Sequence, residues 1–147
     1  MNPVYVFLDF DGVTHPWGEV EDFRCLPELE TVLRDYPETR VVIASDWRTL
    51  FSLPKLAARF SEDIRPRVID TTPTIFPRKP DELYGLRERE AHQWLARKGG
   101  DAQWLAIDDA PGNVDGARAV GMSAVLIGQQ RADVPAALAE LRSLVAL

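Results

Sequence analysis

Short runs of apolar residues, several of them followed directly by acidic or hydroxyl side chains, recur along this 147-residue chain. The runs lie at Val4–Asp9 (VYVFLD), Val41–Ser45 (VVIAS), Trp104–Asp109 (WLAIDD) and Ala124–Ile127. A segment that is apolar at successive positions suits a strand buried on both faces, which is typical of a parallel sheet with helices on either side. We therefore expect an α/β fold built around such a sheet.

Segments with apolar residues at helical spacing separate these runs. They lie at 26–36, 53–60, 86–95, 114–120 and 138–144. Strands that alternate with helices predict a Rossmann-like three-layer sandwich with a central, mostly parallel sheet.

The chain length corresponds to about one domain. Since no repeat, low-complexity tract or linker interrupts the pattern, we expect a single domain over residues 1–147. Residues 61–82 are harder to interpret because four prolines impose turns or extended backbone, although Val68 and Ile69 suit a short strand.

Composition excludes several function classes. The formal charge is −6, which argues against a protein that coats nucleic acid or an anionic membrane through bulk charge. The apolar runs are far shorter than the roughly 18 residues that a membrane span needs. The N-terminus lacks the pattern of a signal peptide, and the lone Cys25 forms no intramolecular disulfide. We therefore expect a soluble protein of a reducing compartment, the cytoplasm.

Acidic and hydroxyl side chains follow three of the predicted strands, at the end of the sheet where α/β proteins bind ligands. Asp9 and Asp11 follow one run, Ser45 another, and Asp108 with Asp109 a third. Crowded carboxylates repel one another unless a cation lies among them. Oxygen ligands without His or Cys favour magnesium over zinc. The sequence therefore predicts a Mg²⁺ site formed by Asp9, Asp11, Asp108 and Asp109.

The same residue types suit phosphoryl transfer. Asp9 can attack phosphorus to form an aspartyl-phosphate. Asp11 can protonate the leaving oxygen and later deprotonate the attacking water. Ser45 can donate a hydrogen bond to the phosphoryl oxygens, and a Lys or Arg can neutralise their growing charge. We expect these residues to be catalytic and the partner to be a phosphorylated substrate.

Three motifs resemble those of the haloacid dehalogenase-like (HAD) superfamily of phosphohydrolases, over nearly the whole chain. VFLDFDG is similar to the first motif, hhhhDxDG, with Asp9 matching the nucleophile and Asp11 the acid/base. VVIAS, ending at Ser45, resembles the second motif. LAIDDAPGNVDGARAVGM resembles the fourth, with Asp108 and Asp109 matching the metal-binding acids. The resemblance implies a magnesium-dependent phosphatase in which the backbone carbonyl of Asp11 also binds the ion.

The third motif of that superfamily is a single basic residue. Arg87 begins the pattern R-x-x-E-A-x-x-W-L and is our candidate, with Arg89 as the alternative. We expect Gly12, Asp46 and Arg48 to bind substrate. Arg48 is the candidate for a second phosphate contact, and the alternative is that it pairs with Asp46 or caps a helix.

The SDWR segment at 45–48 and the helix that begins at Arg87 resemble the HAD domains of RNA-repair proteins and, more distantly, polynucleotide phosphatase domains. HAD proteins often carry a cap, but residues 12–27 are too few for one and residues 61–82 would form a short lid. We therefore expect a nearly capless member whose open site admits a large substrate such as a nucleic-acid end. The 11 basic and 7 acidic residues between Arg48 and Lys98 agree with that expectation.

Two further residues stay open at this stage. His15 either contacts substrate or belongs to a turn, and Trp47 either packs under the sheet end or contacts a substrate base. The alternative function is a non-catalytic domain that keeps the fold and binds phosphate or a partner protein. The intact set of acids argues against this alternative because a passive module has no use for four crowded carboxylates.

Overall fold

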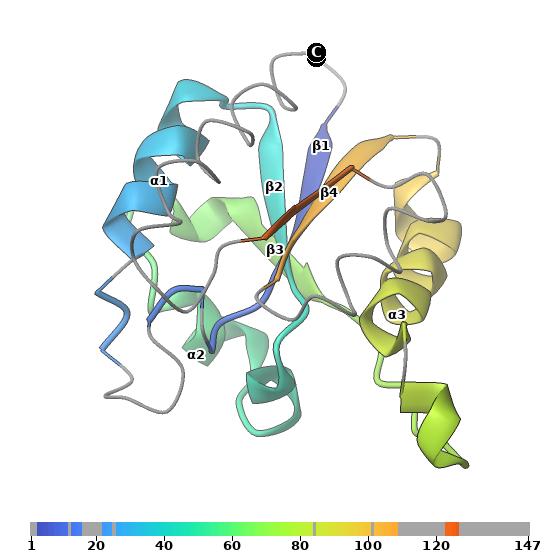
Figure 1. Cartoon of the computed structure of the whole chain (residues 1–147). Helices are drawn as coiled ribbons and strands as arrows, with labels where there is room; N and C mark the ends of the chain where they lie inside the picture. The colour runs from blue at the N-terminus through green and yellow to red at the C-terminus, as the bar shows by residue number, and fades with distance from the viewer. Residues whose placement is uncertain are drawn as a thin grey trace.

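The protein is described by a computed structural model that covers residues 3–11, 13–15, 22–24, 26–83, 85–100, 102–108 and 123–126. Its centre is a five-stranded sheet in the order β3-β2-β1-β4-β5, and every neighbouring pair is parallel (Figure 1). The strands are β1 (Val4–Leu8), β2 (Thr39–Ile43), β3 (Val68–Thr71), β4 (Gln103–Asp108) and β5 (Ser123–Leu126). The predicted α/β class with a central parallel sheet is confirmed.

Helices cover both faces of this sheet. Helices α1 (Leu26–Asp35) and α2 (Leu53–Ala57) pack on one face, and α3 (Leu86–Trp94) packs on the other (Figure 1). The predicted helices at 114–120 and 138–144 lie outside the described residues. Within the ranges given above, each helix falls short of the length and apolar character that a membrane crossing requires.

Side chains of the central strand alternate between two hydrophobic cores. Val6 and Leu8 face α1, where they join Leu29 and Leu33, whereas Phe7 faces α3. On the α3 side the buried residues are Phe7, Val42, Ala44, Ala91, Trp94 and Leu95. Because each fully buried side chain contributes about 1.5–3 kcal/mol, the two cores fix the strands and therefore the positions of the residues that follow them.

Strand β2 begins two residues before the apolar run that predicted it. Thr39 is buried, pairs with Val4 of β1 and donates its hydroxyl to the carbonyl of Tyr36 at 2.7 Å. A polar side chain can therefore occupy this strand position because its hydroxyl is satisfied locally.

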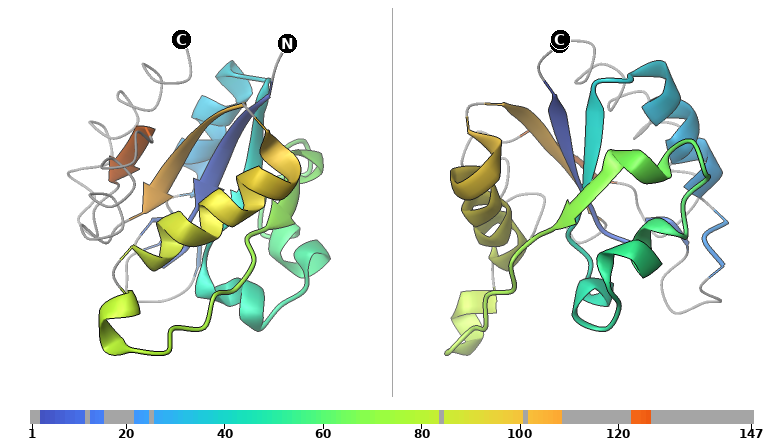
Figure 2. Two further views of the ribbon diagram at one scale, coloured as in Figure 1. Left: turned by 90° about the vertical axis from the view of Figure 1, so that its right-hand side faces the viewer. Right: turned by 180° about the vertical axis from the view of Figure 1, so that it is seen from behind.

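The segment between β2 and α3 contains only short elements. They are the 3₁₀-helices η1 (Asp46–Thr49), η2 (Arg65–Arg67) and η3 (Pro80–Leu83), together with α2 and β3. Strand β3 lies at the predicted Val68–Ile69. Figure 2 shows η3 projecting from the body beside the start of α3, at the end of the sheet where the strands terminate.

Candidate active site

Two carboxylates end neighbouring central strands at the same level. Leu8 of β1 pairs with Ile107 of β4, and the backbone N–H of Asp9 donates to the carbonyl of Ile107 at 3.0 Å. Asp108 is the last residue of β4 and is 5% exposed, whereas Asp9 is half-buried. The parallel register therefore brings together the two acids that the sequence assigns to one site.

This pair has the chemistry of a hard-ion site. Asp9, Asp108 and the Asp11 carbonyl offer only oxygen donors, which suit Mg²⁺. Two carboxylates held at one end of a sheet also repel each other, and a cation between them would remove that repulsion. Among the described residues, no group of three or more His, Cys, Asp or Glu side chains is close enough to form a metal site. Asp109, the fourth predicted acid, lies outside them.

Asp11 follows β1 and has two partners from other parts of the site. Oδ1 of Asp11 lies 2.8 Å from Nε2 of His15, and the indole Nε1 of Trp47 donates to Oδ2 at 3.3 Å. The side chain of Asp11 is 36% exposed, whereas His15 and Trp47 are buried. The carboxylate of Asp11, the predicted acid/base, is therefore accessible to solvent on one side and is contacted by His15 and Trp47 on the other.

Arg87 lies in the first turn of α3 and reaches toward the sheet. Its Nη2 donates to Oδ1 of Asp46 at 2.7 Å, and its Nη1 donates to Oε1 of Glu90 at 3.2 Å. Burial would lower the pKa of Arg87, but its hydrogen bond to Asp46 and the charges of Asp46, Asp9 and Glu90 raise that pKa above its ordinary value. Arg87 is therefore a fixed cation within the electrostatic reach of Asp9.

Arg89, the alternative for the third motif, has a different environment. Its side chain is exposed, and its Nη2 donates to the backbone carbonyl of Glu82 in η3. Arg87 instead contacts Asp46, the residue after Ser45, and its assignment as the basic residue of the site stays a prediction.

Arg48 has protein partners in place of the expected phosphate. Its side chain is 2% exposed and its Nη2 lies 2.6 Å from Oε2 of Glu90, which is 1% exposed. Its N–H groups also donate to the backbone carbonyls of Ala44, Ser45, Thr72 and Pro73. Burial lowers the pKa of Arg48, and the charge of Glu90 partly offsets this effect. The alternative pairing with Asp46 is present at 3.8 Å.

Ser45 follows β2, as expected, and has no exposed surface. Its Oγ accepts a hydrogen bond from the backbone N–H of Trp47 at 3.3 Å and so caps η1. The side chain of Asp46, the next residue, is 81% exposed. Gly12, the remaining predicted substrate contact, lies outside the described residues.

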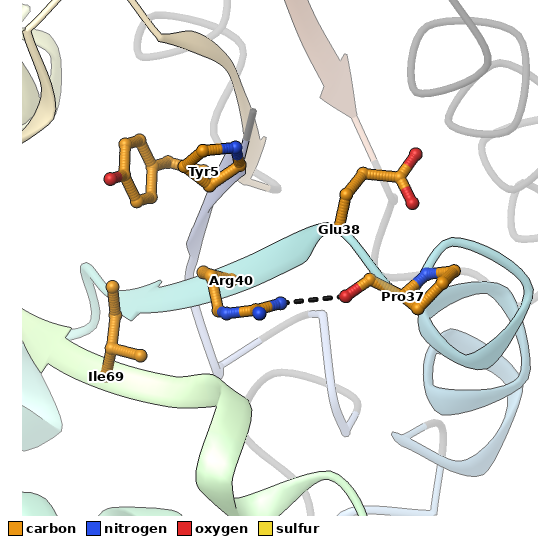
Figure 3. A pocket seen from close by; sticks show the side chains of 6 residues that line it. Tyr5, Pro37, Glu38, Arg40 and Ile69 are labelled. Carbon is orange, nitrogen blue, oxygen red and sulfur yellow. Dashed lines mark hydrogen bonds between the residues drawn. The ribbon is translucent and has the colours of Figure 1, made fainter. Parts of the chain in front are cut away.

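A hollow of about 460 Å³ lies at the opposite end of the sheet (Figure 3). Its walls are Pro3, Tyr5, Pro37, Glu38, Arg40 and Ile69. Arg40 donates to the carbonyl of Pro37 at 2.8 Å across this hollow. Because Tyr5 and Arg40 belong to the starting halves of their strands, the hollow is separate from the carboxylates at the strand ends.

Sequence reasoning left the roles of His15 and Trp47 open and assigned none to Glu90, and all three residues shape the site. Trp47 and His15 contact Asp11, and Glu90 holds both Arg87 and Arg48. Glu90 lies three residues after Arg87 in the R-x-x-E pattern, so its contact with Arg87 was available from helical spacing. The contact between Trp47 and Asp11 spans 36 positions and has no local signal.

Comparison with known families gives one match. The family described as the HAD domain in Swiss Army Knife RNA repair proteins matches residues 5–126, which run from the second residue of β1 to the end of β5 and include the site described above. A search of curated proteins returned no match.

Proposed function

The chain belongs to the HAD domain family of Swiss Army Knife RNA repair proteins, and on this premise we propose that it is a magnesium-dependent phosphomonoester hydrolase. The observation that carries the proposal is the position of Asp9 and Asp108 at the ends of neighbouring strands. The charge of Asp9 also contributes to raising the pKa of Arg87, which supplies a cation to the same site. Such an arrangement of acids and a fixed cation suits a phosphoryl group, whose oxygens need both metal and guanidinium charge.

In the proposed reaction a carboxylate oxygen of Asp9 attacks phosphorus, and the bond between phosphorus and the leaving oxygen breaks. Asp11 gives its proton to that oxygen, so that an alcohol leaves. In the second half, Asp11 takes a proton from water, and the water oxygen displaces Asp9 from phosphorus. Inorganic phosphate leaves and both acids return to their starting states.

The residues that would hold Mg²⁺ are Asp9, Asp108 and the Asp11 carbonyl. When bound, the ion would neutralise the repulsion between the acids and part of the phosphoryl charge. Arg87 supplies positive charge from the α3 side, and its bonds to Asp46 and Glu90 hold its guanidinium in place. The contact of the Ser45 hydroxyl with a phosphoryl oxygen stays a prediction, because this side chain has no exposed surface and its Oγ caps η1.

We further propose that the substrate is large, with a nucleic-acid end as the leading candidate. Within the part of the chain that the structure describes, residues 61–82 contribute β3 to the sheet and form no separate cap, and this feature supports a polymeric substrate. Arg59 is exposed, and its guanidinium lies 5.4 Å from the ring of Phe23 and 5.6 Å from that of Trp47. Since Arg48 is occupied by Glu90, we transfer the second phosphate contact from Arg48 to Arg59.

A phosphatase assay with a trapped intermediate tests the proposed function. The protein is mixed with p-nitrophenyl phosphate and MgCl₂, quenched in acid and measured by intact mass. Wild type should turn over the ester and carry one phosphate, whereas Asp9→Asn should do neither. Asp70→Asn, which removes an acid at β3, is the matched control and should behave as wild type.

Phosphate on the Asp9→Asn protein would refute the assignment of the nucleophile. Absence of turnover for every phosphomonoester would favour the alternative, a non-catalytic domain that binds phosphate or a partner protein.

A further inference from the structure

The carboxylate of Asp11 is held by a tryptophan that lies 36 positions away in the sequence. The indole N–H of Trp47 points at both oxygens of Asp11, with Nε1 at 3.3 Å from Oδ2 and 3.4 Å from Oδ1. Trp47 is 7% exposed, so its N–H has little access to water. A buried N–H without a partner costs about 1–3 kcal/mol, which makes the carboxylate its natural acceptor.

The direction of this N–H is fixed by aromatic packing. The ring of Trp47 meets Phe10 edge-on at 5.6 Å and 80°, and Phe23 at 5.3 Å and 89°. Phe51 packs at 5.6 Å and Arg59 lies over the ring. Since the ring is enclosed by these groups, Trp47 cannot turn its N–H away from Asp11 without repacking the core.

His15 holds the same carboxylate from a second direction. Its Nε2 lies 2.8 Å from Oδ1 of Asp11, and its Nδ1 lies 3.2 Å from the hydroxyl of Thr14. That hydroxyl in turn donates to the carbonyl of Phe10 at 3.1 Å. His15 is 1% exposed, so both ring nitrogens are placed by the fold.

We propose that Trp47 and His15 are positioning residues that hold the Asp11 carboxyl group where the leaving oxygen of the substrate departs. This inference rests on the proposed function, in which Asp11 protonates that oxygen. An Asp side chain has two rotatable torsions, and the contacts with Trp47 and His15 fix its orientation. Because a displacement of about 1 Å can cost about 10²-fold in rate, fixing this group contributes directly to leaving-group departure.

The test compares esters whose leaving groups need a proton to different degrees. A p-nitrophenolate leaves with little proton donation, phenolate needs more, and an alkoxide needs most. Values of kcat/KM for p-nitrophenyl phosphate, phenyl phosphate and an alkyl phosphate therefore report how well Asp11 is placed. Since kcat/KM covers the steps up to leaving-group departure, it excludes the later hydrolysis of the aspartyl-phosphate.

Trp47→Phe removes the N–H and keeps an aromatic ring. We expect kcat/KM for the alkyl phosphate to fall about 10- to 100-fold, part of the 10²–10⁴-fold typical of acid–base help, and that for p-nitrophenyl phosphate by less than about threefold. Trp94→Phe is the matched control. Trp94 is also buried and donates its Nε1 to Asp70 at 2.9 Å, on the α3 face, so its loss should leave the ranking of the esters unchanged.

A second pair of variants covers the case in which Trp47→Phe is poorly folded. His15→Leu should show the same loss, largest for the alkyl phosphate, and His15→Gln should recover most of it because its amide can again form a hydrogen bond with the Asp11 carboxyl group. Equal losses on all three esters, or no loss in Trp47→Phe and His15→Leu, would overturn the positioning role.

Asp11→Asn, measured beside these variants, separates the two hypotheses. If Asp11→Asn shows the steep dependence on the leaving group and the Trp47 and His15 variants do not, only the positioning role fails. If Asp11→Asn hydrolyses the alkyl phosphate as fast as wild type, or wild type hydrolyses none of the esters, the proposed function fails and the inference fails with it.

Discussion

Arg48 and Glu90 form an ion pair in which Nη2 and Oε2 are 2.6 Å apart and neither side chain has more than 2% of its surface exposed. Oε2 of Glu90 also accepts the backbone N–H of Ile75 at 2.9 Å, while Oε1 accepts from Arg87. The pair therefore connects η1, the segment after β3 and helix α3. Through Arg87, the same buried carboxylate also sets the position of the cation in the candidate site.

The first prediction concerns this ion pair. Arg48→Ala should lower the free energy of unfolding by about 3–5 kcal/mol, because it leaves the Glu90 carboxylate buried without its main partner. Asp46→Asn, which changes an exposed partner of Arg48, should cost about 1 kcal/mol or less. Urea unfolding measures both values. A cost for Arg48→Ala as small as that for Asp46→Asn would contradict a structural role for the buried pair.

The second prediction concerns pH. Hydrogen bonds from Arg34 hold the pKa of Asp63 below its ordinary value of 3.8. Since the unfolded chain takes up the proton more readily, this ion pair stabilises the fold above the unfolded pKa, and the contribution is lost as pH falls through the folded pKa. Asp63→Asn should therefore lower the urea midpoint at pH 7 and have a smaller effect near pH 2. An equal difference at both pH values would disprove the linkage.

The third prediction concerns the ion. Mg²⁺ should raise the Tm of the wild-type protein, because it binds the folded state at Asp9 and Asp108. The accompanying gain in the free energy of unfolding grows with concentration and reaches about 2.7 kcal/mol at a hundredfold excess over Kd. The shift should disappear in Asp108→Asn and persist in Asp70→Asn. Thermal unfolding with and without EDTA provides the measurement. A magnesium shift that survives in Asp108→Asn would place the ion elsewhere.

The fourth prediction concerns substrate size. Arg59→Ala should raise KM for a 5′-phosphorylated oligonucleotide more than for p-nitrophenyl phosphate, because only the polymer carries a neighbouring phosphate. The wild-type preference for the polymer should weaken as salt rises. Arg97→Ala, which removes the same charge from an exposed position after α3, is the control and should leave both KM values unchanged. Equal effects of Arg59→Ala on both substrates would favour a small phosphoester.

Apolar runs predicted the strands and the residues that end them because burial on both faces leaves a mark on consecutive residues. Asp9 and Asp108 lie at the strand ends for that reason. No comparable pattern in the sequence indicates the partners of Arg48 and Asp11. Glu90 is 42 positions from Arg48, and Trp47 is 36 positions from Asp11. A phosphate ligand and a buried carboxylate both attract a guanidinium, so the sequence alone does not show which of the two Arg48 contacts.

The strand order also determines the stage of chain synthesis at which the candidate site can form. Strand β1, with Asp9 after it, lies in the middle of the sheet, yet it is synthesised before both of its neighbours. The edge of β1 that pairs with β2 can form its hydrogen bonds early in synthesis. The opposite edge has no partner until β4 is synthesised, about a hundred residues later. Until then a growing chain carries an apolar strand with an unpaired edge, which is a hazard for association between nascent chains. The pair of acids that would bind Mg²⁺ also forms only at that late step, so the ion can secure the finished sheet but cannot guide its early assembly.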